Sequence, residues 1–119
     1  MTGPDQLRPS AGVPMAVGVA LGLVVEVVAL VLAMLSGGAG HGDYAAARAL
    51  FPVPMLTTLL EGDTIGPLSM TLALAQFPLI GALTGYCLAL RRLAPLVAVG
   101  AVHLVAMVLA FSGVIPNFS

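Results

Sequence analysis

Long apolar runs separated by short polar segments dominate this sequence. Three runs are long enough to cross a bilayer as single helices, since a helix rises about 1.5 Å per residue and the hydrocarbon core is about 30 Å thick. Glu26 is the one Asp, Glu, Lys or Arg residue within the three runs. The pattern predicts spanning helices over residues 13–36, 65–90 and 94–114.

The ends of these runs carry residues that favour helix boundaries. Pro67 and Pro95 stand near the starts of the second and third runs, where a missing backbone N–H is tolerated. Gly37 follows the first run, as is common after a helix, and the Arg91–Arg92 pair closes the second. The three helices are therefore bounded by local signals as well as by length.

A fourth apolar segment, residues 44–61, is ambiguous. Asp43 is a candidate N-cap, and Pro52 and Pro54 are expected to break or kink a helix. Residues 44–60 would reach only about 26 Å as a straight helix, slightly less than the hydrocarbon core. The segment is either a short full crossing or a re-entrant or interfacial hairpin.

The arginines do not decide between these alternatives. Four crossings place Arg48, Arg91 and Arg92 on the cytoplasmic side, whereas three crossings place Arg8, Arg91 and Arg92 there. We favour a full crossing, because residues 45–60 carry a single charge and would expose a large apolar patch in water. The predicted fold is all-α: a polytopic integral membrane protein, a small four-helix bundle with a short, proline-broken second helix.

This fold implies one domain with two short tails. Residues 1–12 hold two prolines and two glycines without an apolar period, which indicates a disordered N-terminal tail. A cleaved signal peptide is not favoured, because the next run is long and carries Glu26 at its middle. We expect a single transmembrane domain over 13–115 and a C-terminal tail over 116–119.

Composition supports the membrane assignment. The 119 residues are 60% hydrophobic and 8% charged, against about 25% charged in soluble domains. All four cations are dispersed arginines, so nucleic acid is not an expected partner. The single cysteine, Cys87, is interpreted as a small buried hydrophobe. We expect a multi-pass protein of a bacterial inner (plasma) membrane.

Three polar side chains fall near the middle of three different runs. They are Glu26, Gln76 and His103. A charged acid at the centre of a bilayer costs about 2.5–3.5 kcal/mol, so Glu26 must be protonated, paired or facing a cavity. If the three faces meet, Gln76 can bridge the acid and the imidazole. We interpret this cluster as interhelical hydrogen bonding, with a proton or ion pathway as the alternative.

Small residues and prolines predict how the helices pack. Gly18 and Gly22 continue with Glu26 in steps of four, which places the acid on a face that another helix can approach closely. Gly81 and Gly85 form a second such pair, about 140° around the helix from Gln76. These two faces imply two neighbours, of which one is a candidate for a second subunit.

Pro78 lies inside the second long run. It removes a backbone donor, frees the carbonyl of Leu74 and predicts a kink beside Gln76.

The sequence contains no recognised catalytic motif. His41 and Asp43 could join Glu61 and Asp63 around a metal only if segment 44–61 were a hairpin, and we interpret Asp43 as a helix cap. We therefore predict no metal, no cofactor and no enzyme activity. An interfacial enzyme using His41 and Asp43 is disfavoured.

The predicted function is a non-catalytic structural or accessory subunit of a membrane complex, or a homo-oligomer, within the lipid bilayer. The alternative is a proton-linked channel or transporter that uses Glu26 and His103 as titrating groups.

Overall fold

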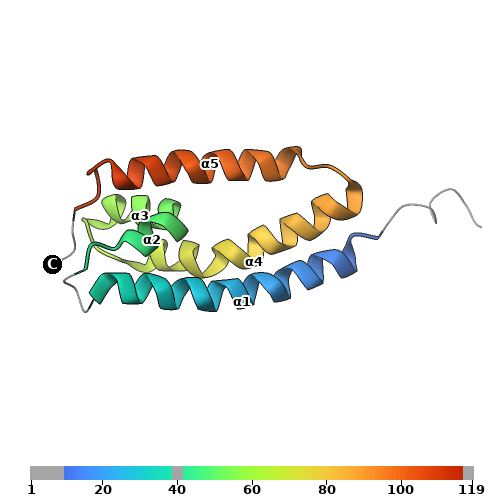
Figure 1. The fold of residues 1–119 in the computed structure, drawn as a ribbon, viewed down its shortest axis with the longest axis horizontal. Helices are drawn as coiled ribbons and strands as arrows, with labels where there is room; N and C mark the ends of the chain where they lie inside the picture. The colour runs from blue at the N-terminus through green and yellow to red at the C-terminus, as the bar shows by residue number, and fades with distance from the viewer. Residues whose placement is uncertain (1–9, 39–41, 117–119) are drawn as a thin grey trace, which may run out of the picture.

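The protein is all-helical in the computed structural model, which describes residues 10–38 and 42–116 (Figure 1). Three long helices dominate it: α1 (Gly12–Gly37), α4 (Pro67–Leu90) and α5 (Ala94–Phe111). Their lengths are about 39, 36 and 27 Å. All three are long and apolar enough to cross a membrane, so the all-helical fold and the three long helices predicted from the sequence are confirmed.

The helix boundaries follow from local residues. Helix α1 ends where Gly38 takes a left-handed conformation and donates its N–H to the carbonyl of Leu35. Pro67 and Pro95 lie in the first turns of α4 and α5. Arg91 ends α4, also with a left-handed backbone. Most of the predicted N-terminal tail, residues 1–9, and residues 117–119 of the C-terminal tail lie outside the described residues.

Helices α1 and α4 pack as an antiparallel pair, and their backbones come into close contact. A methyl group on Gly18 would overlap the carbonyl oxygen of Gly81, and one on Gly85 would overlap that of Pro14. One turn further along α1, Gly22 meets the backbone of Phe77. The absence of side chains at these glycines is therefore what allows the two long helices to touch.

The short, proline-broken crossing expected over 44–61 is not confirmed as a single spanning helix. The segment instead forms two six-residue helices and a short 3₁₀ turn: α2 (Ala45–Leu50), α3 (Pro52–Thr57) and η3 (Thr58–Glu61). The helical conformation is interrupted at Phe51, whose φ and ψ are −125° and 51°. The break has a local cause, because Pro52 and Pro54 have no N–H to continue the hydrogen bonds of α2.

Both ends of this segment lie at the same end of the molecule (Figure 1). This follows from the antiparallel packing of α1 and α4, which puts the last turn of α1 beside the first turn of α4. Helix α2 enters between the long helices, and α3 returns toward the end where α2 began (Figure 1). We call residues 44–61 the hairpin, and Phe51 with its neighbours Ala49, Leu50 and Pro52 the hairpin tip.

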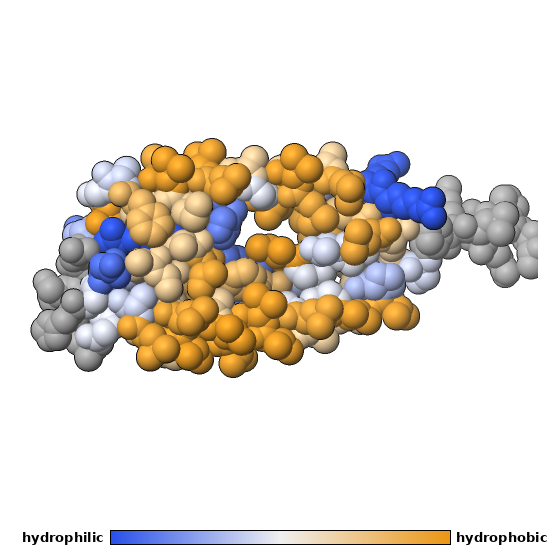
Figure 2. Space-filling view, viewed as in Figure 1, coloured by the Kyte–Doolittle hydropathy of each residue, from blue (hydrophilic) through white to orange (hydrophobic). Residues whose placement is uncertain are grey.

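Helix α5 covers the hairpin. Ala110 of α5 and Ile115 beyond it are buried together with Ala47 of α2 and Met55 of α3. Outside this core the long helices expose many valines and leucines, which form the apolar surface seen in Figure 2. Beyond the hairpin tip, Figure 2 shows a hollow between α4 and α5.

Candidate functional site

The hairpin tip leaves backbone carbonyls without helical partners. Within α2 and its cap, the N–H of Phe51 bonds to the carbonyl of Ala47. If the helix continued, the carbonyls of residues 48, 49 and 50 would accept hydrogen bonds from the N–H groups of residues 52, 53 and 54. Two of these three residues are prolines, which have no N–H, and the chain turns at Phe51. A buried carbonyl without a donor is costly, so the tip needs donors from elsewhere in the protein.

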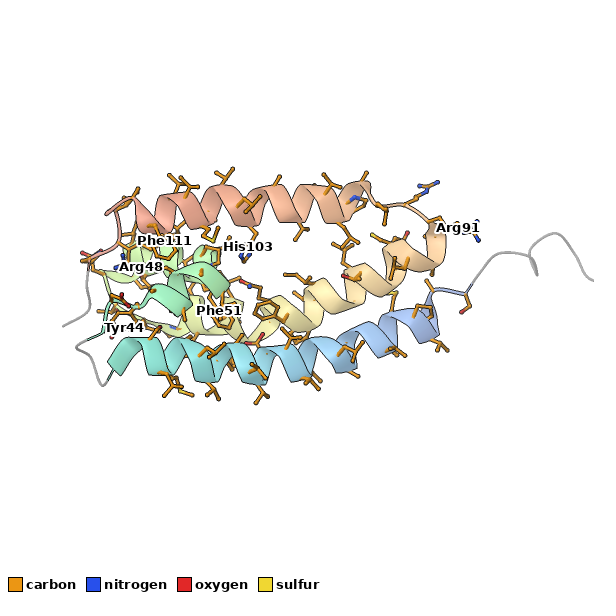
Figure 3. The ribbon with its side chains drawn as sticks, in the orientation of Figure 1. Tyr44, Arg48, Phe51, Arg91, His103 and Phe111 are labelled. Atoms are coloured by element: carbon orange, nitrogen blue, oxygen red, sulfur yellow. The ribbon has the colours of Figure 1, made fainter. Side chains whose placement is uncertain are left out.

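Two side chains from the long helices supply these donors. Gln76 of α4 donates its Nε2–H to the carbonyl oxygen of Leu50 at 2.7 Å. His103 of α5 lies with Nε2 at 2.9 Å from the carbonyl oxygen of Ala49. Because a carbonyl only accepts, the imidazole must carry its hydrogen on Nε2. Figure 3 shows His103 reaching from α5 toward the hairpin.

An aromatic contact also holds the hairpin tip. The rings of Phe51 and Phe77 meet edge to face, with centroids 5.5 Å apart and planes at 77°. Phe51 is only 3% exposed. Such a pair adds about 0.5–1.5 kcal/mol beyond its buried area, so the tip is held to α4 by packing as well as by the Gln76 hydrogen bond.

Glu26 lies on the other side of α4, in its contact with α1. The side chain is 4% exposed, and its Oε2 accepts the backbone N–H of Phe77 at 3.3 Å. Gly22, one turn before it, gives α4 the room to come this close. Oε1 of Glu26 is buried and has no hydrogen-bond partner among the described residues.

The three polar residues expected to form one cluster thus have separate partners. In the part of the chain that the structure describes, Glu26, Gln76 and His103 each bond to a backbone group and not to one another. They are nevertheless linked through neighbouring residues: Glu26 binds Phe77, next to Gln76, and Phe77 packs on the hairpin tip. Gln76 and His103 thus bind the turn of the hairpin directly, whereas Glu26 is connected to it only through Phe77.

The two faces of α4 have two different neighbours within this chain. Gly81 and Gly85 face α1, whereas Gln76 faces the hairpin. Both faces, of which one was a candidate for contact with another subunit, are therefore occupied by parts of the same chain. Helix α4 continues through Pro78 and bends along its length (Figure 1).

Glu61 has a role that the sequence analysis missed. Its carboxylate accepts the backbone N–H groups of Gly66, Leu68 and Ser69 at the start of α4, and the hydroxyl of Ser69. These donors lower the pKa of Glu61 below its ordinary value, with the Ser69 hydroxyl as the largest cause. No spacing rule signals this contact, because the acid stands several residues before the helix that it caps.

Polar contacts also anchor the open end of the hairpin. Arg48 donates to the carbonyl of Ile115 at 3.4 Å, and Ser36 of α1 accepts the N–H of Ala47 at 3.3 Å. Asp43 accepts the N–H of Ala45 at 3.0 Å, although Tyr44 and not Asp43 occupies the N-cap position of α2.

His41, considered above with Asp43 as a metal ligand, lies outside the described residues. Among residues 10–38 and 42–116, no group of three or more His, Cys, Asp or Glu side chains is placed to hold a metal ion.

A groove of about 400 Å³ runs between α4 and α5 beside the hairpin tip. Apolar side chains form its walls, among them Leu79 and Ile80 of α4 and Val99 and Val102 of α5. Among the described residues that line it, Gln76 and His103 are the polar ones. The donors that hold the hairpin tip are thus also the polar part of an apolar groove, which is the hollow visible in Figure 2.

Comparison of the chain with protein-family models, curated proteins and solved structures finds no match. The assignment of a function therefore depends on the geometry described above.

Proposed function

We propose that the chain is a multi-pass integral membrane protein of a bacterial inner membrane, with α1, α4 and α5 as crossings and the hairpin entering and leaving on one side. The length and apolar surface of the three helices support this proposal. So does the hairpin itself, because its turn is enclosed by other elements and the carbonyls of Ala49 and Leu50 have donors, as backbone at membrane depth requires.

The same arrangement gives the proposed orientation. With three crossings, Arg91 and Arg92 lie on the cytoplasmic side together with Arg8 of the N-terminal segment, and Arg48 lies on the opposite side. Arg48 is accommodated there by its bond to the Ile115 carbonyl.

Within the membrane, we propose that the protein acts as a non-catalytic structural or accessory subunit, or as a homo-oligomer. One observation carries this proposal: Gln76 and His103, two of the three polar groups at mid-helix, use their donors to hold backbone carbonyls of the hairpin. Polar groups with such a structural role are typical interhelical contacts in membrane proteins. The outward faces of the long helices remain available to lipid or to partner helices.

Oligomeric state tests this proposal. The full chain, reconstituted in phosphatidylcholine nanodiscs and crosslinked in native membranes, should give a defined homo-oligomer or one stoichiometric complex. A monomer in nanodiscs that also forms no crosslinked species in native membranes would contradict it.

One observation favours the alternative, a proton-linked channel or transporter. Oε1 of Glu26 is buried without a hydrogen-bond partner among the described residues, as a proton-binding group in a pathway would be. This alternative requires that Glu26→Gln abolish a pH-driven flux in liposomes. Asp63→Asn, which changes an exposed acid in the loop before α4, is the matched control. Flux equal to that of protein-free vesicles at every pH removes the alternative.

A further inference from the structure

The groove between α4 and α5 combines an apolar wall with unused hydrogen-bond acceptors. Nε2 of Gln76 and Nε2 of His103 are engaged by the hairpin, which leaves Oε1 of Gln76 and Nδ1 of His103. Neither atom has a hydrogen-bond partner among the described residues, and neither is fully buried. Both side chains line the groove, and we infer that these two acceptors face its interior.

The chemistry of the two atoms is defined by the bonds already made. His103 carries its hydrogen on Nε2, so in the neutral imidazole Nδ1 is an acceptor. Oε1 of Gln76 is also an acceptor. In apolar surroundings an accessible acceptor favours a ligand that brings a donor, because an unmatched polar group is costly there.

The groove has the size of a small-molecule site. Its volume of about 400 Å³ falls within the range of about 300–1,000 Å³ found for ligand pockets. Its walls are supplied by α4, α5 and Val53 and Pro54 of the hairpin, so an occupant would contact all three.

We propose that this groove binds a small lipid-soluble molecule that carries an alcoholic or phenolic hydroxyl. The hydroxyl donates to Nδ1 of His103 or Oε1 of Gln76, and the apolar body lies between α4 and α5. Val53 and Pro54 of the hairpin thereby form one end of a binding site, in addition to any role of the protein as a subunit. The proposal does not depend on the oligomeric state.

Two matched ligands test the role of the hydroxyl. 4-Octylphenol and its methyl ether, 4-octylanisole, differ in whether they have a donor. We expect 4-octylphenol to raise the unfolding temperature of the protein in phosphatidylcholine nanodiscs, at a mole fraction in the bilayer about threefold to tenfold lower than the ether needs. Equal effects of the two ligands would mean that the groove accepts any chain, and would overturn the proposal.

Two matched variants test the location. Ala98 lines the groove, whereas Ala101 is also exposed on α5 but does not line it. Ala98→Phe should fill the groove and weaken the effect of 4-octylphenol at least tenfold, and Ala101→Phe should leave it unchanged. Because both alanines are exposed, both variants are expected to fold, and each unfolding temperature without ligand verifies this. Equal responses of the two variants would place the ligand elsewhere and overturn the proposal.

Discussion

Nε2 of His103 lies 2.9 Å from the carbonyl oxygen of Ala49, which joins α5 to the turn of the hairpin. The bond matters because α2 has ended and cannot supply a donor for this carbonyl. Gln76 does the same for Leu50 from α4, so two successive carbonyls are held by two different helices. The hairpin is therefore specified by residues far from it in sequence.

Removing the His103 donor should destabilise the protein. His103→Leu leaves the Ala49 carbonyl without a partner, at a cost of about 1–3 kcal/mol in the free energy of unfolding. His103→Gln keeps a donor at a comparable distance from the backbone and should recover most of this loss. Denaturation by SDS in mixed micelles measures the free energy of unfolding of both variants. Similar losses in the two would show that the hydrogen bond of His103 does not cause the destabilisation.

The contact of α1 with α4 should not tolerate a methyl group. Gly18→Ala would overlap the Gly81 carbonyl, and we expect a loss of about 1–3 kcal/mol in the free energy of unfolding. Gly100→Ala is the control, because Gly100 lies within α5 with open space around it. It should be neutral or should stabilise the protein by up to about 1 kcal/mol. Equal destabilisation of the two variants would contradict the packing described here.

The cap of α4 should make stability depend on acid pH. The pKa of Glu61 is lowered in the folded protein from an ordinary value of 4.5. Its contribution to stability is therefore complete above about pH 4.5 and is lost as the pH falls through the folded-state pKa. Between pH 7 and pH 3 the unfolding temperature of the wild-type protein should fall more than that of Glu61→Gln.

Asp63→Asn is the control for this experiment, because Asp63 is exposed in the loop that follows Glu61. This variant should keep the pH dependence of the wild-type protein. A pH dependence that persists in Glu61→Gln would show that the carboxylate of Glu61 does not cause it.

Much of the fold could be predicted from local features. The three long helices follow from uninterrupted apolar length, and their ends lie at or near prolines and glycines such as Pro67, Pro95 and Gly37. The spacing of Gly18 and Gly22 predicted Glu26 on a face that another helix approaches, because in a helix a period of four keeps residues on one side, and Glu26 is 4% exposed in the structure.

The path of residues 44–61 could not be predicted in this way. Four crossings would make α1 and α4 parallel, whereas three make them antiparallel, and glycines spaced by four allow either packing. The observed direction depends on long-range contacts such as that of Gly18 with Gly81. Pro52 and Pro54 indicated a break in the helix, but a break alone does not say whether the chain continues or returns.

The candidate site was predictable in part. Apolar surroundings singled out Gln76 and His103, but their partners are backbone carbonyls, which every residue has and no sequence pattern marks. Glu61 was missed for a related reason, since it caps α4 across an intervening loop.

The side from which each end of the hairpin is accessible tests the central claim most directly. Single cysteines are introduced in a Cys87→Ala background. Two of them replace Asp43 and Asp63, which are exposed at the two ends of the hairpin, and the third replaces Leu93, which is exposed in the loop that connects α4 to α5. A membrane-impermeant maleimide is applied to intact and to permeabilised cells. We predict that positions 43 and 63 are labelled from the same side and position 93 from the other. Labelling of 43 and 63 from opposite sides would mean that this segment crosses the membrane, and would contradict the hairpin.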